Sequence, residues 1–133
     1  MEQLQIKKGS TMIDLWCWDG KVLRFFSKNF WIKSGDGLDI NWFAIIKWKI
    51  FNKYYKIDNV HLYKKNFFGA DLKKYDYIYL YLRDTQLECM EDWIRKEKNK
   101  DCIIISNTFK FKKHKPFKVY KNDKNYDTIL LYK

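Results

Sequence analysis

Short apolar runs alternate along this chain with longer stretches in which apolar residues recur at helical spacing. The short runs predict five β-strands, at residues 11–15, 37–40, 60–63, 75–82 and 102–105. The helical spacing predicts three helices, at residues 21–29, 43–54 and 85–98. This alternation predicts an α/β fold whose mostly parallel sheet carries helices on both faces.

Three parts of the pattern place particular residues. The helix over residues 43–54 is expected to begin at an Asn41 cap. Its buried face is expected to carry the apolar residues Phe43, Ile46, Ile50 and Tyr54. The run at residues 75–82 is long and aromatic, so we expect it in the middle of the sheet. Weaker strands near residues 117–120 and 128–132, joined by polar residues 121–125, predict a C-terminal antiparallel hairpin that puts one antiparallel strand at an edge.

The length of the chain fits one domain. It has 133 residues, 47% of them hydrophobic, which is enough for a single core, so we predict one domain over residues 1–133. No run approaches the ~18 apolar residues of a membrane span, and residues 1–8 lack the apolar core of a signal peptide. We therefore expect a cytoplasmic protein without a membrane span. Three cysteines without C-x-x-C spacing indicate no disulfide framework and no metal site.

The formal charge of +11 has two interpretations. Lysine and arginine that neutralise phosphates release counterions, so the charge is compatible with a nucleic-acid partner. The positive charge is nearly all lysine, however, and the chain is rich in the residues that AT-rich codons specify, so the base composition of the genome is a strong rival explanation of the charge. The lysines are also spread through every segment, as on a solvated surface.

Acidic residues end the first two predicted strands. Asp14 ends the first strand and opens a loop over residues 14–20, and Asp39 ends the second strand. In an open doubly wound sheet, ligands bind beyond the carboxyl ends of the strands, at the switch point. A carboxylate at Asp39 suits the two hydroxyls of a ribose. Asp36, in the turn expected before that strand, is predicted to be solvated.

The loop after the first strand carries a recognisable motif. Residues 13–23, I-D-L-W-C-W-D-G-K-V-L, resemble the D-L-G-C-G-D-G-R-V-L cofactor motif of class I S-adenosylmethionine-dependent methyltransferases. Residues 37–41, G-L-D-I-N, are similar to the second-strand motif of that family, and residues 66–67 fall where it has an acidic and an apolar residue beside the adenine. The resemblance covers nearly the whole chain and implies a Rossmann-like domain that binds S-adenosylmethionine. The cofactor-binding residues that it implies are Asp14, Trp16, Cys17, Trp18, Gly20, Asp39, Ile40, Asn66 and Phe67.

A narrower resemblance concerns the methyl acceptor. Residues 79–82, Y-L-Y-L, and 105–109, I-S-N-T-F, are similar to a subgroup of small protein-lysine methyltransferases. This implies a protein substrate with a lysine acceptor, and Tyr79 and Tyr81 as catalytic candidates that line the acceptor pocket. The alternative is that these tyrosines are core aromatics. The chain starts some ten residues before the first predicted strand, without the family's N-terminal lid helices, so we expect an open site or a lid from a partner.

Trp16 and Trp18 stand where the family has glycine. Glycine suits such a loop because the backbone turns tightly and approaches the ligand closely. Either catalysis has been lost, or UGA codons that mean glycine have been translated as tryptophan. Six tryptophans against five glycines reverse normal usage and favour recoding. Trp31 and Trp48 are further candidates for recoding, whereas Trp93 on a helical apolar face fits a genuine tryptophan.

Three functions therefore follow from the sequence. The first is an S-adenosylmethionine-dependent methyltransferase that acts on a protein lysine. The second is a catalytically inactive methyltransferase-like binding module, if Trp16 and Trp18 are genuine. The third is an RNA methyltransferase, for which the net charge of +11 is the support.

Overall fold

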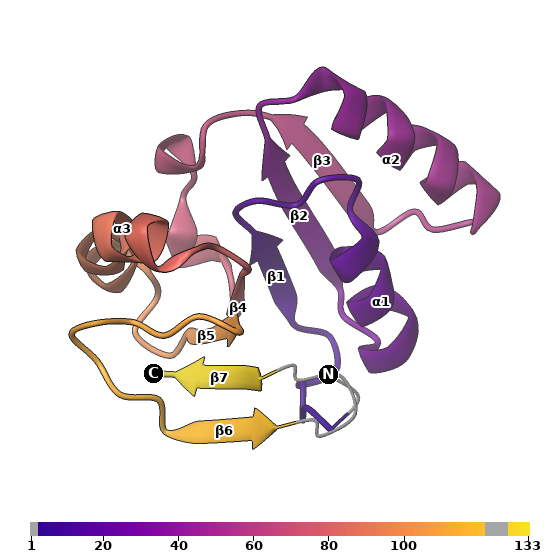
Figure 1. Ribbon diagram of the computed structural model, residues 1–133. Helices are drawn as coiled ribbons and strands as arrows, with labels where there is room; N and C mark the ends of the chain where they lie inside the picture. Colours follow the sequence, from indigo (N-terminus) through magenta and orange to yellow (C-terminus); the bar gives the residue numbers. More distant parts are fainter. Residues whose placement is uncertain (1–2, 122–127) are drawn as a thin grey trace.

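The computed structural model describes residues 3–121 and 128–133, which form one sheet with helices on both faces (Figure 1). The order of its strands is β3-β2-β1-β4-β5-β7-β6. The strands are β1 (Thr11–Asp14), β2 (Ser34–Asp39), β3 (Val60–Lys64), β4 (Tyr77–Leu80), β5 (Ile103–Asn107), β6 (Lys118–Lys121) and β7 (Thr128–Tyr132). The helices are α1 (Lys21–Phe30), α2 (Trp42–Tyr54) and α3 (Asp84–Glu97), and the 3₁₀ turns are η1 (Phe67–Gly69) and η2 (Leu72–Lys74).

Strands β1 to β5 pair in parallel, and β7 pairs antiparallel with both β5 and β6. The predicted C-terminal hairpin is therefore present, but the expected place of the antiparallel strand was wrong. Strand β7 lies between β5 and β6, and β6 forms the edge. The reason is burial: β7 buries Ile129, Leu130 and Leu131, whereas most of β6 is exposed. The turn predicted at residues 121–125 lies almost wholly outside the described residues.

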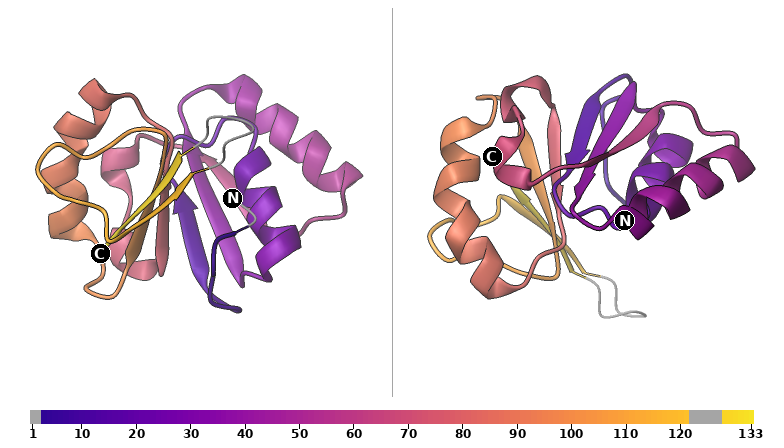
Figure 2. Two further views of the ribbon diagram at one scale, coloured as in Figure 1. Left: turned by 60° about the horizontal axis from the view of Figure 1, so that its bottom comes forward. Right: turned by 90° about the horizontal axis from the view of Figure 1, so that it is seen from above.

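The two faces of the sheet carry different helices. Figure 2 shows α1 and α2 on one side and α3 on the other. Successive residues of a strand point to opposite faces. In β4, accordingly, Ile78 and Leu80 pack in the core cluster under α3, and Tyr77 and Tyr79 pack in the cluster under α1. The central position expected for this strand is confirmed, since β4 pairs with β1 and β5.

Strand β2 begins earlier than the apolar run predicted. It starts at Ser34, so Asp36 lies within the strand, where it accepts a 2.7 Å hydrogen bond from the Tyr75 hydroxyl. The expectation that Asp36 is solvated in a turn was therefore wrong. Gly35 and Gly37 also lie within the strand. They have no side chain, so α1 and the loop before it can pack directly on the strand backbone. A Cβ atom at Gly37 would lie 2.7 Å from the Sγ of Cys17.

Helix α2 begins as predicted but presents a different face to the core. The Asn41 side chain accepts a 3.0 Å hydrogen bond from the backbone N–H of Phe43, which caps the helix. The face predicted to be buried is exposed, so that prediction was wrong: the residues concerned are Phe43, Ile46, Ile50 and Tyr54. The helix has apolar residues around its circumference, and hydrogen bonds fix its rotation. The side chains of Trp48 and Asn52 both donate to the Val60 carbonyl, at 3.2 and 2.8 Å.

Residues 3–10, which precede β1, contain no helix. Within the described residues, no helix has both the length and the apolar character to cross a membrane.

Candidate functional site

The carboxyl ends of the parallel strands meet at one edge of the sheet, at the upper side of the parallel strands in Figure 1. Asp14 ends β1 and Asp39 ends β2. Strand β1 pairs with β2 on one side and with β4 on the other, so the strand order switches direction beside Asp14. A switch point of this kind is where doubly wound sheets bind ligands.

The loop between β1 and α1 is held against the end of β2 by backbone hydrogen bonds. The N–H of Cys17 donates to the Leu38 carbonyl at 3.1 Å, and the N–H of Trp18 donates to Oδ2 of Asp39 at 3.1 Å. Gly20 closes the loop in the left-handed conformation, with φ of 79°, at the start of α1. These contacts bring the loop and the Asp39 carboxylate together, as the sequence predicted.

Asp39 has acceptor capacity to spare. Its Oδ1 accepts the N–H of Asn41 at 2.8 Å, and its Oδ2 accepts the N–H of Trp18. An ionised carboxylate has about four lone-pair sites. Two backbone donors therefore orient this carboxylate and leave room for two further donors from a ligand.

Asp14 is buried below the loop, where its Oδ1 accepts the backbone N–H of Trp16 at 3.1 Å. Burial raises the pKa of this carboxyl to about 7, and the nearby Asp39 carboxylate raises it further, while the hydrogen bond from Trp16 opposes the rise. A cationic group bound above Asp14 would favour its ionised form.

A small pocket opens beside the loop, at the ends of β2 and β3. It is lined by Leu15, Trp16, Leu38, Asp39, Ile40, Lys65, Asn66 and Phe67. Five of the predicted cofactor residues are in this lining: Trp16, Asp39, Ile40, Asn66 and Phe67. The other three lining residues, Leu15, Leu38 and Lys65, were not among the predicted ones. The two leucines adjoin the predicted carboxylates and were accessible to prediction, whereas no local pattern marks Lys65.

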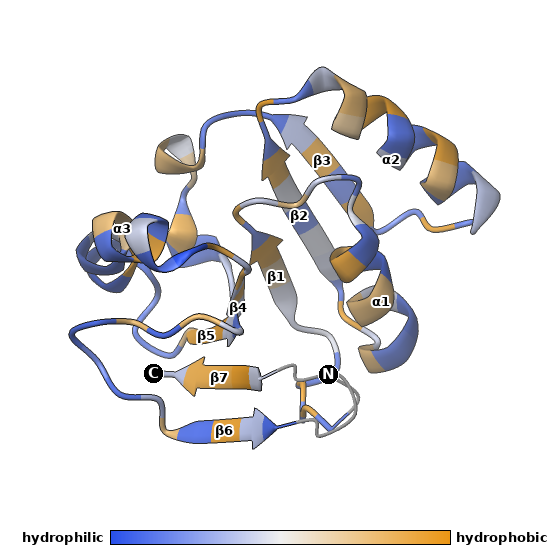
Figure 3. Ribbon diagram, in the orientation of Figure 1, coloured by the Kyte–Doolittle hydropathy of each residue, from blue (hydrophilic) through white to orange (hydrophobic). Residues whose placement is uncertain are grey.

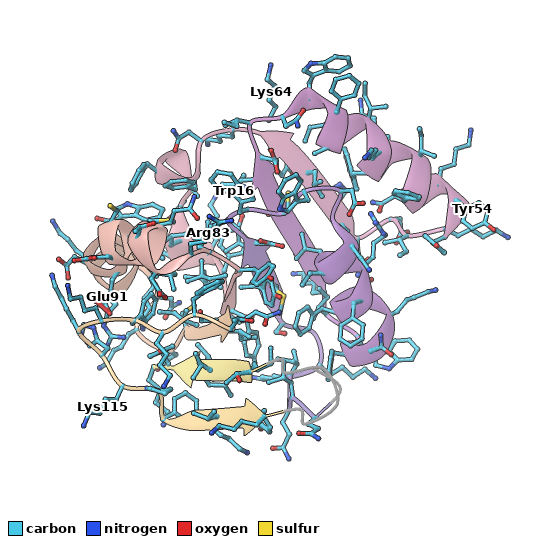
Figure 4. All side chains as sticks on the ribbon, in the orientation of Figure 1. Trp16, Tyr54, Lys64, Arg83, Glu91 and Lys115 are labelled. Carbon is cyan, nitrogen blue, oxygen red and sulfur yellow. The ribbon has the colours of Figure 1, made fainter. Side chains whose placement is uncertain are left out.

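The Trp16 side chain limits the volume of this pocket. Its ring packs against Phe67 with the ring centroids 6.4 Å apart, at the carboxyl edge of the sheet where Figure 4 labels it. The remaining cavity measures about 60 Å³. Ligand pockets usually measure roughly 300–1,000 Å³. The carboxylate and the apolar walls fit an adenosyl group in chemistry, but with Trp16 in this position the space does not hold one.

The other predicted cofactor residues lie in the loop but do not line this pocket. Cys17 is buried against Gly37, and burial raises the pKa of its thiol well above its usual range. Trp18 has φ of 52°, and 62% of its side chain is exposed. Asp14 accepts a hydrogen bond from the loop backbone at Trp16, and Gly20 ends the loop at the start of α1.

The structure separates the two candidate catalytic tyrosines. Tyr79 is buried against Phe26, and its hydroxyl accepts a 3.0 Å hydrogen bond from Asn107 at the end of β5. Tyr81 is exposed just beyond β4 and lies beside Phe109, with the ring centroids 6.1 Å apart. Tyr81 is therefore an accessible aromatic side chain at the same edge as the pocket, beside the partly buried Phe109, while Tyr79 packs in the core.

Solved structures with this arrangement include several methyltransferases. An RNA methyltransferase from Salinibacter ruber in complex with S-adenosyl-L-homocysteine matches with a TM-score of 0.87 at 17% identity, over 96% of this chain and 82% of that chain. The chain has a methyltransferase fold. An rRNA methylase from Streptococcus thermophilus matches with a TM-score of 0.66 at 16% identity, over 95% and 86% of the two chains.

A third similar structure is an S-adenosylmethionine-dependent methyltransferase from Geobacter sulfurreducens, also in complex with S-adenosyl-L-homocysteine. It matches with a TM-score of 0.65 at 16% identity, over 77% of this chain and 43% of that chain. Comparison with protein-family models gave no match, and comparison with curated proteins gave none.

Proposed function

We propose that this protein is an S-adenosylmethionine-dependent methyltransferase. The observation that carries the proposal is the Asp39 carboxylate, which two backbone N–H groups hold at the switch edge of a methyltransferase fold with two acceptor sites to spare. Two of the similar structures contain S-adenosyl-L-homocysteine, which is the molecule that remains when S-adenosylmethionine has given up its methyl group.

Different residues around the pocket would contact different parts of the cofactor. Asp39 would accept hydrogen bonds from the two ribose hydroxyls, and Ile40 and Phe67 would enclose the adenine between apolar surfaces. The loop over residues 16–20 and the buried Asp14 would hold the charged amino-acid end. When bound, S-adenosylmethionine supplies a methyl group on a positively charged sulfur, and a nucleophile displaces it.

The acceptor side of the site would be the exposed ring of Tyr81, which lies beside the partly buried Phe109. A lysine acceptor must lose its proton before it attacks, and a less polar surface lowers its pKa. Aromatic rings also attract the cation before deprotonation. Tyr81 would therefore contact the acceptor, while Tyr79 would act behind it by holding Asn107. These features support a protein lysine as the acceptor.

We further propose that positions 16 and 18 are glycine in the protein that the cell makes. Within the described residues, four non-glycine residues have positive φ: Trp18, Trp31, Lys56 and Thr108. Tryptophan is among the residues least suited to that conformation, and glycine is the most suited. Trp18 and Trp31 at such positions support UGA codons that mean glycine. At position 16 the support is different: removal of the Trp16 ring would open the pocket.

Two of the other tryptophans, Trp31 and Trp48, differ from each other in backbone conformation and surroundings. Trp31 is 70% exposed and ends α1 in the left-handed conformation, where helices commonly have glycine. Trp48 instead packs on the core and donates a hydrogen bond to Val60, which supports a genuine tryptophan there. If Trp16 and Trp18 are also genuine, the second hypothesis applies, and the protein is an inactive binding module.

Two measurements test this proposal. Sequencing the gene distinguishes UGA from UGG at positions 16 and 18, and mass spectrometry of the peptide from the native source shows which residue is present. UGG codons and tryptophan in the native peptide would overturn the recoding. Calorimetry of the Trp16→Gly/Trp18→Gly protein with S-adenosylmethionine then tests binding, and no binding at millimolar concentration would overturn the proposed function.

RNA is a second candidate acceptor, and one observation favours it. The segment after β5 borders a groove of about 670 Å³ that is lined by Lys110, Lys112, Lys113, Lys115 and Lys121. Lys112 and Lys113 pair with Glu88 and Asp92 on α3, so much of their charge is already balanced. The test is transfer of a tritiated methyl group into a cell extract by the glycine-restored protein. Label removed by protease indicates a protein acceptor, and label removed by ribonuclease indicates RNA.

A further inference from the structure

Helix α2 presents an apolar stripe to solvent. The stripe consists of Phe43, Ile46, Ile50 and Tyr54, which follow one another at intervals of three and four residues and so share one face of the helix. All four side chains are exposed, Ile50 by 60% and Tyr54 by 76%. Figure 2 shows α2 as the outermost element on its side of the sheet, and Figure 4 shows Tyr54 pointing away from the molecule at the end of the helix.

The charged residues of α2 that flank the stripe are all lysines. At 100° per residue, Lys47 lies on one side of it and Lys49 and Lys53 lie on the other. No acidic residue occurs in α2, and Figure 3 shows hydrophobic residues interrupted by hydrophilic ones along its whole length. The surface therefore combines a convex apolar ridge with lysines along both margins. An occupant of this surface must offer apolar contact and negative charge together.

We propose that α2 docks on an anionic membrane surface. Amphipathic helices that lie in the membrane interface bury their apolar residues about 5–10 Å deep, and their lysines contact the anionic lipid headgroups. The α2 stripe has this composition and projects outward as a ridge. A second copy of the chain is a poor occupant, because antiparallel pairing of two stripes would bring six lysines together without a carboxylate between them, on chains that each carry a net charge of +11.

Docking through α2 would also orient the candidate site. The helix follows directly from the end of β2, so its first residues, Trp42 and Phe43, lie next to Ile40 of the pocket lining. The pocket would then lie close to the membrane surface, at the N-terminal end of the docked helix. The docking itself does not depend on methyl transfer, so either proposal can fail without the other.

Sedimentation with lipid vesicles tests the proposal. The chain is expected to bind vesicles of equal parts phosphatidylcholine and phosphatidylglycerol, and to bind pure phosphatidylcholine vesicles at least tenfold more weakly. Ile46→Gln/Ile50→Gln should weaken binding to the anionic vesicles at least tenfold, because it removes the inserted side chains and keeps good helix formers. Each of Lys47→Gln, Lys49→Gln and Lys53→Gln should weaken it roughly fivefold.

The matched control is Phe117→Gln/Val119→Gln, which removes two exposed apolar side chains at the opposite edge of the sheet and should leave vesicle binding unchanged. Circular dichroism checks that each variant is folded. Equal binding by the folded stripe variant and the unaltered chain would overturn the proposal, since charge alone would then explain binding. Absence of vesicle binding would also overturn the proposal. If Ile46→Gln/Ile50→Gln then converts a dimer to a monomer in light scattering, the stripe binds a second copy of the chain. If it does not, the occupant is an acidic protein.

Discussion

The backbone N–H of Trp18 donates a 3.1 Å hydrogen bond to the Asp39 carboxylate, which ties the loop after β1 to the end of β2. The two residues are far apart in the sequence, and the bond orients a carboxylate that a ligand can also use. A change at either residue therefore affects both the shape of the loop and the binding of a ligand.

Asp39→Ala in the Trp16→Gly/Trp18→Gly protein is expected to weaken binding of S-adenosyl-L-homocysteine at least tenfold in calorimetry. A hydrogen bond to a charged group contributes about 1.5–3 kcal/mol, and about 1.4 kcal/mol corresponds to a factor of ten. Asp92→Ala is the control, because that carboxylate is exposed on α3 and contacts Lys113. Equal affinities of the two variants would contradict the ribose role of Asp39.

Trp18→Gly is expected to raise the free energy of unfolding by about 1 kcal/mol in urea denaturation. The left-handed conformation costs a non-glycine residue roughly 1–2 kcal/mol, and the greater freedom of glycine in the unfolded chain offsets part of that gain. Trp31→Gly is the matched control, since Trp31 has φ of 55° outside the pocket. It should stabilise the protein similarly without creating cofactor binding, and binding gained by Trp31→Gly alone would contradict the role given to the loop.

Asp14 is expected to make the free energy of unfolding depend on pH. Its pKa is about 7 in the folded protein against 3.8 for the ordinary group, so between about pH 4 and 7 the folded chain holds a proton that the unfolded chain has released. The contribution of this carboxyl to stability therefore falls as the pH rises through that window. Asp14→Asn should remove this contribution and be more stabilising at pH 7.5 than at pH 4.5 in urea denaturation. Parallel stability curves for the two proteins would show that the burial of Asp14 is misjudged.

Gly37→Ala is expected to destabilise the protein by roughly 1–3 kcal/mol, the usual effect of overpacking. The new Cβ atom would lie 2.7 Å from both Cβ and Sγ of Cys17, so the loop would have to move away from β2. Gly69→Ala is the control, because its Cβ would meet the flexible end of the Lys65 side chain at 2.9 Å. Thermal unfolding of the two variants measures the difference, and a Gly69→Ala variant that is the less stable of the two would contradict this packing.

Local patterns in the sequence determined the order of the elements and much of the candidate site. The period of the apolar residues gave α1 and α3 to within one residue at each end, because each of these helices buries one continuous face. The motif around Asp14 and the carboxylate at Asp39 marked the switch edge, since residues that end parallel strands are brought together by the fold itself.

The tertiary structure decided what depends on contacts between distant residues. The orientation of α2 could not be predicted, because the helix carries apolar residues on more than one face. Hydrogen bonds from Trp48 and Asn52 to Val60 turn its stripe of Phe43, Ile46, Ile50 and Tyr54 outward. Burial placed β7 between β5 and β6, and packing separated the core residue Tyr79 from the exposed Tyr81. Each of these outcomes depends on which side of an element meets the core, and residues remote in the sequence fix that side.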